Sequence, residues 1–225
     1  MMTRYGWLTV WLMLPVWMGG CPPVPGDSDP TAWVSVVHTS PDAPLVDVCA
    51  EGGELFLDLG YRGATEYAEV LAGVYQFKLI PAGAGCGSAG IIAADVDLPD
   101  YTDTTIVAID FLSRLDILVL DDDNSVPPAG FARMRFVHTS VNTPVVDLTL
   151  ATGTTLFDDV GFAQVSDYIE IQAGTYDLDV RDTTATTLLL PVDGVTLIDG
   201  AVYTFYLVGL QNGSPALELI FTRDR

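Results

Sequence analysis

The feature that most constrains the fold is an internal repeat. Residues 36–48 read VVHTSPDAPLVDV and residues 136–148 read FVHTSVNTPVVDL. Residues 55–67 match residues 156–168, and residues 71–79 match residues 172–180. The matches keep their order and nearly keep their spacing, so we infer that a module of about 95 residues was duplicated. The chain is therefore expected to fold as two copies of one small domain.

Each copy is predicted to consist of β-strands. Val, Thr, Leu, Asp and Gly are abundant, and turn-forming residues recur about every ten positions. In the first copy, strands are predicted near 33–38, 45–50, 54–58, 65–71, 73–80, 90–97, 104–111 and 114–120. So many short strands favour an antiparallel β-sandwich of immunoglobulin-like type. We predict such all-β domains at 31–123 and 131–225, joined by a linker at 124–130 that reads NSVPPAG.

The N-terminus has the pattern of an export signal. Arg4 is the only charge in residues 1–20, and residues 6–18 form an apolar stretch too short to cross a bilayer. Gly-Gly-Cys follows, which is similar to a bacterial lipobox. We expect residues 1–20 to be a lipoprotein signal peptide, Cys21 to be lipidated and residues 21–30 to form a Pro-rich tether. The alternative is an ordinary signal peptide followed by an incidental cysteine.

Charge and anchor together predict location and partners. The formal net charge is −21, and removal of Arg4 would make it more negative. Such a surface repels phosphate backbones, so no nucleic acid is expected as a partner. The expected location is the cell envelope, on the outer membrane or cell surface of a Gram-negative bacterium, because Pro22 rather than Asp follows Cys21. Expected partners are the membrane, through the N-terminal lipid, and a surface polysaccharide or another envelope protein.

Two further cysteines, Cys49 and Cys86, both lie in the first copy. In an oxidising compartment such a pair is expected to form a disulfide, closing a loop of 37 residues. A redox or metal-binding pair is the alternative, but CxxC spacing and further ligands are missing from the sequence around them.

The best candidate for chemistry is the repeated motif, comprising His38, Ser40, Asp47, His138, Ser140 and Asp147. A hydroxyl, an imidazole and a carboxylate are the groups that acyl transfer requires. The GxSxG sequence is missing, however, and the alternation of residues 34, 36 and 38 predicts that His38 points inward. We expect a structural role, in which the His is buried at the end of its sandwich and hydrogen-bonded to Asp47 or to a turn amide. Catalysis by His38, Ser40 and Asp47 is the alternative.

Metal binding has one weak candidate. Asp121, Asp122 and Asp123 supply clustered oxygens that would suit calcium, although their spacing is not that of an EF-hand. Solvated turn residues are the alternative interpretation. No cofactor is expected.

The HTS…P..VD segments, the AG.Y turns and the tandem arrangement after a lipobox resemble a bacterial family, domain of unknown function 4397. The first copy fits its opening motif closely, whereas the second has Val141-Asn142-Thr143 where the first has Pro41-Asp42-Ala43. The resemblance covers almost all of residues 33–225. It implies an exported or surface-associated β-sandwich and no assigned activity.

The resulting functional prediction is a non-catalytic cell-envelope lipoprotein that displays two modules for binding or adhesion. A structural spacer or envelope-assembly component is one alternative, and an envelope hydrolase is another. Tyr61, Tyr101 and Phe162 are candidates to stack on sugars, with packing in a core or an interface as the alternative for each.

Overall fold

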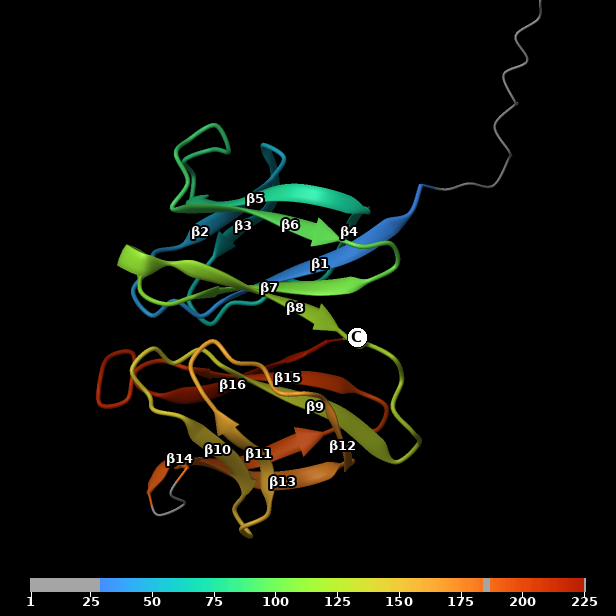
Figure 1. Cartoon of the computed structure of the whole chain (residues 1–225), viewed down its shortest axis with the longest axis vertical. Coiled ribbons are helices and arrows are strands. Elements are labelled where there is room, and N and C mark those ends of the chain that lie inside the picture. Colours follow the sequence, from blue (N-terminus) through green and yellow to red (C-terminus); the bar gives the residue numbers. More distant parts are fainter. Residues whose placement is uncertain (1–28, 184–186, 225) are drawn as a thin grey trace, which may run out of the picture.

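The computed structural model describes residues 29–183 and 187–224 of the chain. These residues fold into two β-sandwiches stacked on each other, each built from two four-stranded sheets (Figure 1). The all-β class and the tandem arrangement are thereby confirmed. The expected signal peptide and Cys21 lie outside the described residues. Within those residues, no helix is long and apolar enough to cross a membrane.

The first sandwich contains eight strands: β1 (Thr31–His38), β2 (Val46–Ala50), β3 (Gly53–Leu59), β4 (Ala68–Leu71), β5 (Gly73–Pro81), β6 (Ile92–Leu98), β7 (Asp103–Ile109) and β8 (Asp116–Asp122). The order is β4-β1-β7-β8 in one sheet and β3-β2-β5-β6 in the other. Every predicted strand is present. The bounds differ most at β4, which begins at Ala68 and not at residue 65, and a short 3₁₀ helix (Leu112–Arg114) separates β7 from β8.

The second sandwich repeats this topology with β9 (Phe131–His138), β10 (Val146–Leu150), β11 (Thr155–Val160), β12 (Ile169–Gln172), β13 (Gly174–Asp182), β14 (Leu188–Leu197), β15 (Val202–Val208) and β16 (Glu218–Arg223). The sheet orders are β12-β9-β15-β16 and β11-β10-β13-β14. One detail differs from the predicted antiparallel sandwich, because β1 and β7 pair in parallel, as do β9 and β15. A parallel pair needs a long connection, and five strands separate each of these partners along the chain.

Each sandwich encloses a core of its own. Alternate residues of β1, such as Val34 and Val36, point inward with Phe77 and Ile106. In the second core, Met134 and Phe136 of β9 take the places of Val34 and Val36. They pack with other fully buried side chains: Leu148, Val180 and Phe205. The period-two pattern of the sequence therefore corresponds to the inward face of each strand.

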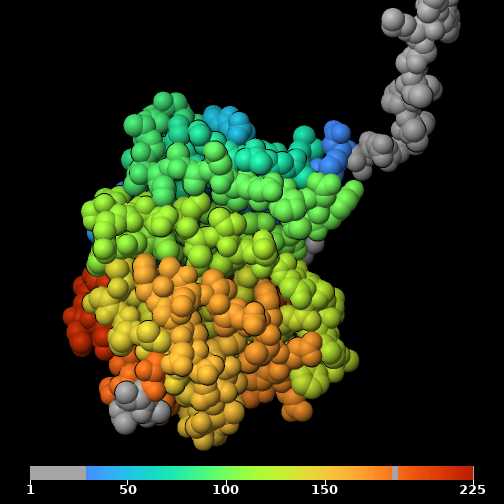
Figure 2. Space-filling model, in the orientation of Figure 1, coloured from blue at the N-terminus to red at the C-terminus, as the bar shows by residue number. Residues whose placement is uncertain are grey.

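A third apolar layer lies between the two sandwiches, where the sheet containing β1 faces the sheet containing β9 (Figure 1). The space-filling view shows the two units meeting directly on the side drawn (Figure 2). Strand β15 consequently has seven buried residues in succession, because it is covered on both faces. The layer joins side chains of both copies: Val37, Val107, Ile109, Leu120, Val137, Tyr206 and Val208. The two copies thus share buried surface in addition to their separate cores.

The predicted disulfide is confirmed. Cys49 on β2 is bonded to Cys86 in the segment between β5 and β6, with a Cα–Cα distance of 5.8 Å. Both cysteines pack with Ile80 in a small buried cluster at the outer sheet of the first sandwich. The bridge therefore lies away from the layer between the sandwiches.

Replacement of Tyr206 tests the importance of that layer. Tyr206 is fully buried between the sandwiches, so we expect Tyr206→Ala to lower the free energy of unfolding by about 3–5 kcal/mol. Tyr101→Ala is the matched control, because Tyr101 is 71% exposed and its loss should change stability by less than about 0.5 kcal/mol. Urea denaturation measures both. Equal stability of the two variants would contradict the packing described.

Candidate functional site

The histidines of the repeated motif are buried and bonded to backbone carbonyls. Nε2 of His38 lies 3.2 Å from the carbonyl oxygen of Pro44, and Nε2 of His138 lies 3.0 Å from that of Pro144. A carbonyl oxygen only accepts, so in each ring Nε2 carries the proton and donates it. Burial lowers the pKa of both imidazoles, although the bond to the carbonyl opposes this. Each ring therefore holds the loop that follows its strand.

The other motif residues have separate partners. The carboxylate of Asp47 accepts hydrogen bonds from the backbone N–H groups of Asp58 and Gly83, at 2.9 and 2.7 Å. Asp147 accepts the equivalent bond from the N–H of Asp159. The hydroxyl of Ser140 donates to the carbonyl oxygen of Gly209 at 2.7 Å.

The motif does not assemble into a catalytic triad. Ser40 and His38 are both fully buried, and no hydrogen bond among the described residues joins either of them to the other or to Asp47. The suggestion that Asp47 is the partner of His38 is wrong, since the partner is the Pro44 carbonyl. The carboxylate of Asp47 instead accepts hydrogen bonds from the N–H groups of Asp58 on β3 and of Gly83 in the loop after β5.

The acidic run at 121–123 does not converge on a common point. Asp122 points into the layer between the sandwiches, where it pairs with Arg135. Asp123 pairs with Arg133 at 2.8 Å and accepts a hydrogen bond from Ser125, and Asp121 is exposed. Among the described residues, no three His, Cys, Asp or Glu side chains are arranged to hold a metal ion. Successive strand residues face opposite ways, so adjacent aspartates on β8 are directed apart.

Of the three candidate sugar-stacking residues, two pack between the sandwiches. Tyr61 and Phe162 are partly buried against the third apolar layer, and only Tyr101 is largely exposed. Packing in an interface, the alternative considered for each, therefore applies to Tyr61 and Phe162.

A buried polar network that the sequence did not indicate lies beside this layer. Nε of Arg135 donates to the hydroxyl of Thr204 at 2.9 Å, and its guanidinium pairs with Asp122 across the junction. The guanidinium carbon also lies 4.8 Å from the centre of the Tyr168 ring. Asp122 in turn accepts hydrogen bonds from Tyr67 and Thr105 of its own sandwich.

The two halves of the junction are related by an approximate twofold arrangement. Ser35 of β1 pairs with Thr105 of β7, and Arg135 of β9 pairs with Thr204 of β15 at the same place in the ladder. Thr105 donates to Asp122, and Thr204 donates to Asp224 at 2.6 Å. Asp224 is thus the counterpart of Asp122. Tyr67 corresponds to Tyr168 by the sequence repeat.

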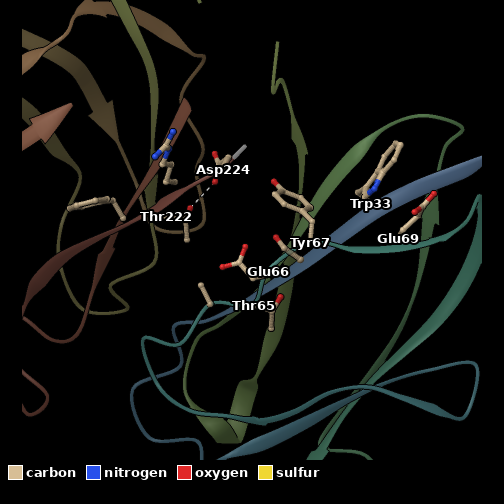
Figure 3. Close-up of a pocket in the computed structure, with 11 residues that line it drawn as sticks. Trp33, Thr65, Glu66, Tyr67, Glu69, Thr222 and Asp224 are labelled. Atoms are coloured by element: carbon tan, nitrogen blue, oxygen red, sulfur yellow. Dashed lines mark hydrogen bonds between the residues drawn. The ribbon is translucent and has the colours of Figure 1, made fainter. Parts of the chain in front are cut away.

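On the half that contains Ser35, the junction leaves an open pocket of about 670 Å³. Figure 3 shows Asp224 and Thr222 on one wall, with Thr65, Glu66 and Tyr67 opposite them. Trp33 and Glu69 lie together at the far end of the same pocket (Figure 3). The pocket lining thus combines three aromatic side chains and the exposed Arg223 with three carboxylates, Glu66, Glu69 and Asp224.

Asp224 is the unusual group in this pocket. Its side chain is bonded to the hydroxyls of Thr204 and Thr222 at 2.6 and 2.8 Å, but no ion pair of Asp224 is found among the described residues. Burial raises the pKa of Asp224 to about 6, and the hydrogen bonds from Thr204 and Thr222, with a smaller attraction by Arg135, offset this only in part. The ionised carboxylate of a buried aspartate such as Asp224 is stabilised by a nearby positive charge.

The differences between the two copies were the signal that could have revealed this site. Where the second copy has Arg133 and Arg135, the first has Trp33 and Ser35. Strand alternation alone does not show that positions 35 and 135 meet a second sheet, so the sequence does not mark these positions as part of a site.

Comparison with known proteins gives a family for both copies. The family described as "Domain of unknown function (DUF4397)" matches residues 32–149 and 144–225. The chain belongs to this family. The resemblance inferred from the HTS…P..VD segments is therefore confirmed, and membership in DUF4397 brings no assigned activity. Among curated proteins, none is similar enough in sequence to count as a relative.

Solved structures show only distant likeness to this DUF4397 protein. The C-terminal domain of AlgF from P. aeruginosa is 21% identical, over 43% of this chain and 99% of that chain, with a TM-score of 0.32. A streptococcal virulence factor that binds alpha-glucan is 12% identical, over 84% and 95% of the two chains, with a TM-score of 0.26. The Bacillus anthracis TIE protein is 11% identical, over 81% of this chain and 34% of that chain, with a TM-score of 0.25. At TM-scores this low, the likeness establishes no shared function.

The lowered histidine pKa values predict a pH-dependent stability. Below about pH 6.5 both histidines are protonated in the unfolded chain, whereas the buried rings of His38 and His138 stay neutral in the folded chain because their pKa values are lowered. The contribution of the two rings to stability is therefore complete above that pH and is lost as the pH falls. We expect the stability advantage of the wild type over a His38→Gln, His138→Gln variant to shrink between pH 7.5 and 5.

Urea denaturation at several pH values provides the measurement. The raised pKa of Asp224 acts in the opposite direction, but it is common to both proteins and cancels in the difference. A difference that stayed constant with pH would mean that the rings are protonated equally in the folded and unfolded chains.

Proposed function

We propose that this chain is a non-catalytic lipoprotein of the cell envelope whose two sandwiches act as one binding unit, with its binding site in the pocket between them. The partner is another envelope protein that reaches the pocket from outside. The observation that carries the proposal is the pocket of about 670 Å³ at the junction, whose lining combines aromatic side chains with carboxylates. Trp33 and Ser35 stand in this half where the other half has Arg133 and Arg135, each paired with a carboxylate.

The N-terminal sequence supports the envelope location. An apolar segment at 6–18 and a Gly-Gly-Cys sequence ending at Cys21 suit lipid attachment after export. The Pro-rich stretch at 22–30 would hold the sandwiches up to roughly 30 Å from the membrane surface in an extended form. A disulfide such as Cys49–Cys86 forms and persists in an oxidising compartment outside the cytoplasm.

The geometry of the repeated motif supports a binding role over hydrolysis. The imidazoles of His38 and His138 are buried and bonded to carbonyl oxygens, and their serines are buried as well. A nucleophile must reach its substrate, which these hydroxyls do not do in the folded chain. The pocket at the junction is open, and ligand sites form preferentially where two domains meet.

The anchor is tested by replacing the cysteine. Cys21→Ser should move the protein from the membrane fraction to the soluble fraction and abolish labelling by a palmitate analogue, because lipid attachment needs the thiol. Ser28→Ala, in the same tether, should change neither result. Unchanged membrane association of Cys21→Ser would remove the anchor from the proposal.

The binding site is tested by photo-cross-linking in cells. A photoreactive residue at Glu66, which lines the pocket, should give a product with an envelope protein. The same residue at Asp193, an exposed position on β14 in the outer sheet, should not. Products from both positions, or from neither, would contradict a binding site at the junction, and a glycosidase-sensitive product would assign the pocket to a polysaccharide instead of a protein.

A further inference from the structure

The two halves of the junction differ in charge at corresponding positions. On the second copy's half, Arg133 is paired with Glu170 at 3.3 Å, and Arg135 is paired with Asp122. On the first copy's half, Trp33 lies opposite Glu69 in the ladder, at the same place that Arg133 takes opposite Glu170. Both arginines of one half are therefore absent from the other, while the carboxylates are kept.

The side chain of Arg135 occupies the space that stays open on the other half. The hollow around Arg135 has a volume of about 290 Å³ and is lined by Val165, Ser166, Asp167 and Tyr168. The corresponding positions 64–67 line the larger pocket, where Ser35 stands in place of the arginine. The Ser35 hydroxyl is hydrogen-bonded to the neighbouring hydroxyl of Thr105, at 2.7 Å, and this short side chain leaves the space beyond it unfilled by the described residues.

The internal arginine shows which chemistry this kind of site accepts. Arg135 places its guanidinium against the buried carboxylate of Asp122 and over the ring of Tyr168. The open half offers the same pair of groups, the buried carboxylate of Asp224 and the ring of Tyr67, at the corresponding positions. Exposed Glu66 and Glu69 add negative charge along the pocket.

Arg223, the residue before Asp224 on the chain, is not paired with the Asp224 carboxylate among the described residues. Arg223 lines the pocket but is exposed, and it lies next to Asp224 on the chain. Phe221 lines the pocket as well. Because successive residues of β16 alternate, the side chains of Phe221 and Arg223 leave the strand on the face opposite to that of Thr222. Phe221 contacts the rings of Tyr203 and Phe205 on that side.

We propose that the pocket at the junction binds the guanidinium group of an arginine side chain presented by the partner protein, in the position corresponding to that of Arg135. This inference rests on the binding function proposed above and names the chemistry of the partner. A planar guanidinium suits the site better than an ammonium group, because it can donate two hydrogen bonds to a carboxylate while lying flat on an aromatic ring. A metal ion is a poorer fit, since no three carboxylates among the described residues converge on one point.

The test uses a short acetylated and amidated Gly-Arg-Gly peptide as the probe and the mature chain in detergent as the receptor. Trp33 lines the pocket and is the only tryptophan after residue 20, so its fluorescence reports binding. We expect saturable binding, and at least tenfold weaker binding of the matched peptide that carries neutral citrulline in place of arginine.

Variants of the pocket provide the controls. Ser35→Arg should place an internal guanidinium against Asp224, as Arg135 does against Asp122, and so abolish peptide binding and raise the melting temperature. Asp193→Asn, which removes a carboxylate from an exposed position on the outer sheet, should leave binding unchanged. Asp224→Asn should weaken binding by tenfold or more, and it keeps the test valid if Ser35→Arg does not fold.

The outcomes separate this inference from the proposed function. Equal binding of the arginine and citrulline peptides, or full affinity in Ser35→Arg, would overturn the guanidinium site. A cross-link from Glu66 that persists while no arginine peptide binds would leave a binding pocket with a different ligand. Loss of both the cross-link and the peptide binding would overturn the proposed function as well.

Discussion

The packing of one sheet of each sandwich against the other is the interaction on which the rest of the structure depends. A sheet in a sandwich normally hides one face, but the sheets containing β1 and β9 hide both. Polar groups that reach this layer lose contact with water and need partners inside the protein. Arg135 and Asp122 satisfy each other there, and the loss of either would leave an uncompensated buried charge.

The duplication explains why this packing is nearly symmetric. Two copies of one domain that associate through the same face form a self-complementary junction, as the subunits of a twofold dimer do. Val37 and Val137, or Ile109 and Val208, accordingly occupy corresponding places in the shared layer. The symmetry is broken at Ser35 and Arg135, and the half that contains Arg135 has the smaller of the two pockets.

The repeated HTS…P..VD motif has its explanation in the fold of each copy. His38 and His138 each donate a hydrogen bond to a carbonyl oxygen in the loop after the first strand of their sandwich. Asp47 and Asp147, on the second strand, each accept a hydrogen bond from a backbone N–H of the third strand. These bonds occur once in every copy because each sandwich must pair the same backbone groups. The pocket, in contrast, depends on positions at which the copies differ.

Sequence patterns alone predict the strands, the two sandwiches, the Cys49–Cys86 bridge and the inward direction of the motif histidines. These features follow from short-range alternation, turn residues and the repeat, which can all be recognised along one chain. The packing of the two domains adds what these patterns do not contain: β1 and β9 are covered on their second face, Asp122 faces Arg135, and Asp224 lines a pocket. The physical reason is that alternation specifies which side of a strand is apolar, whereas the contact between two sheets depends on how whole domains pack, and no local pattern records that choice.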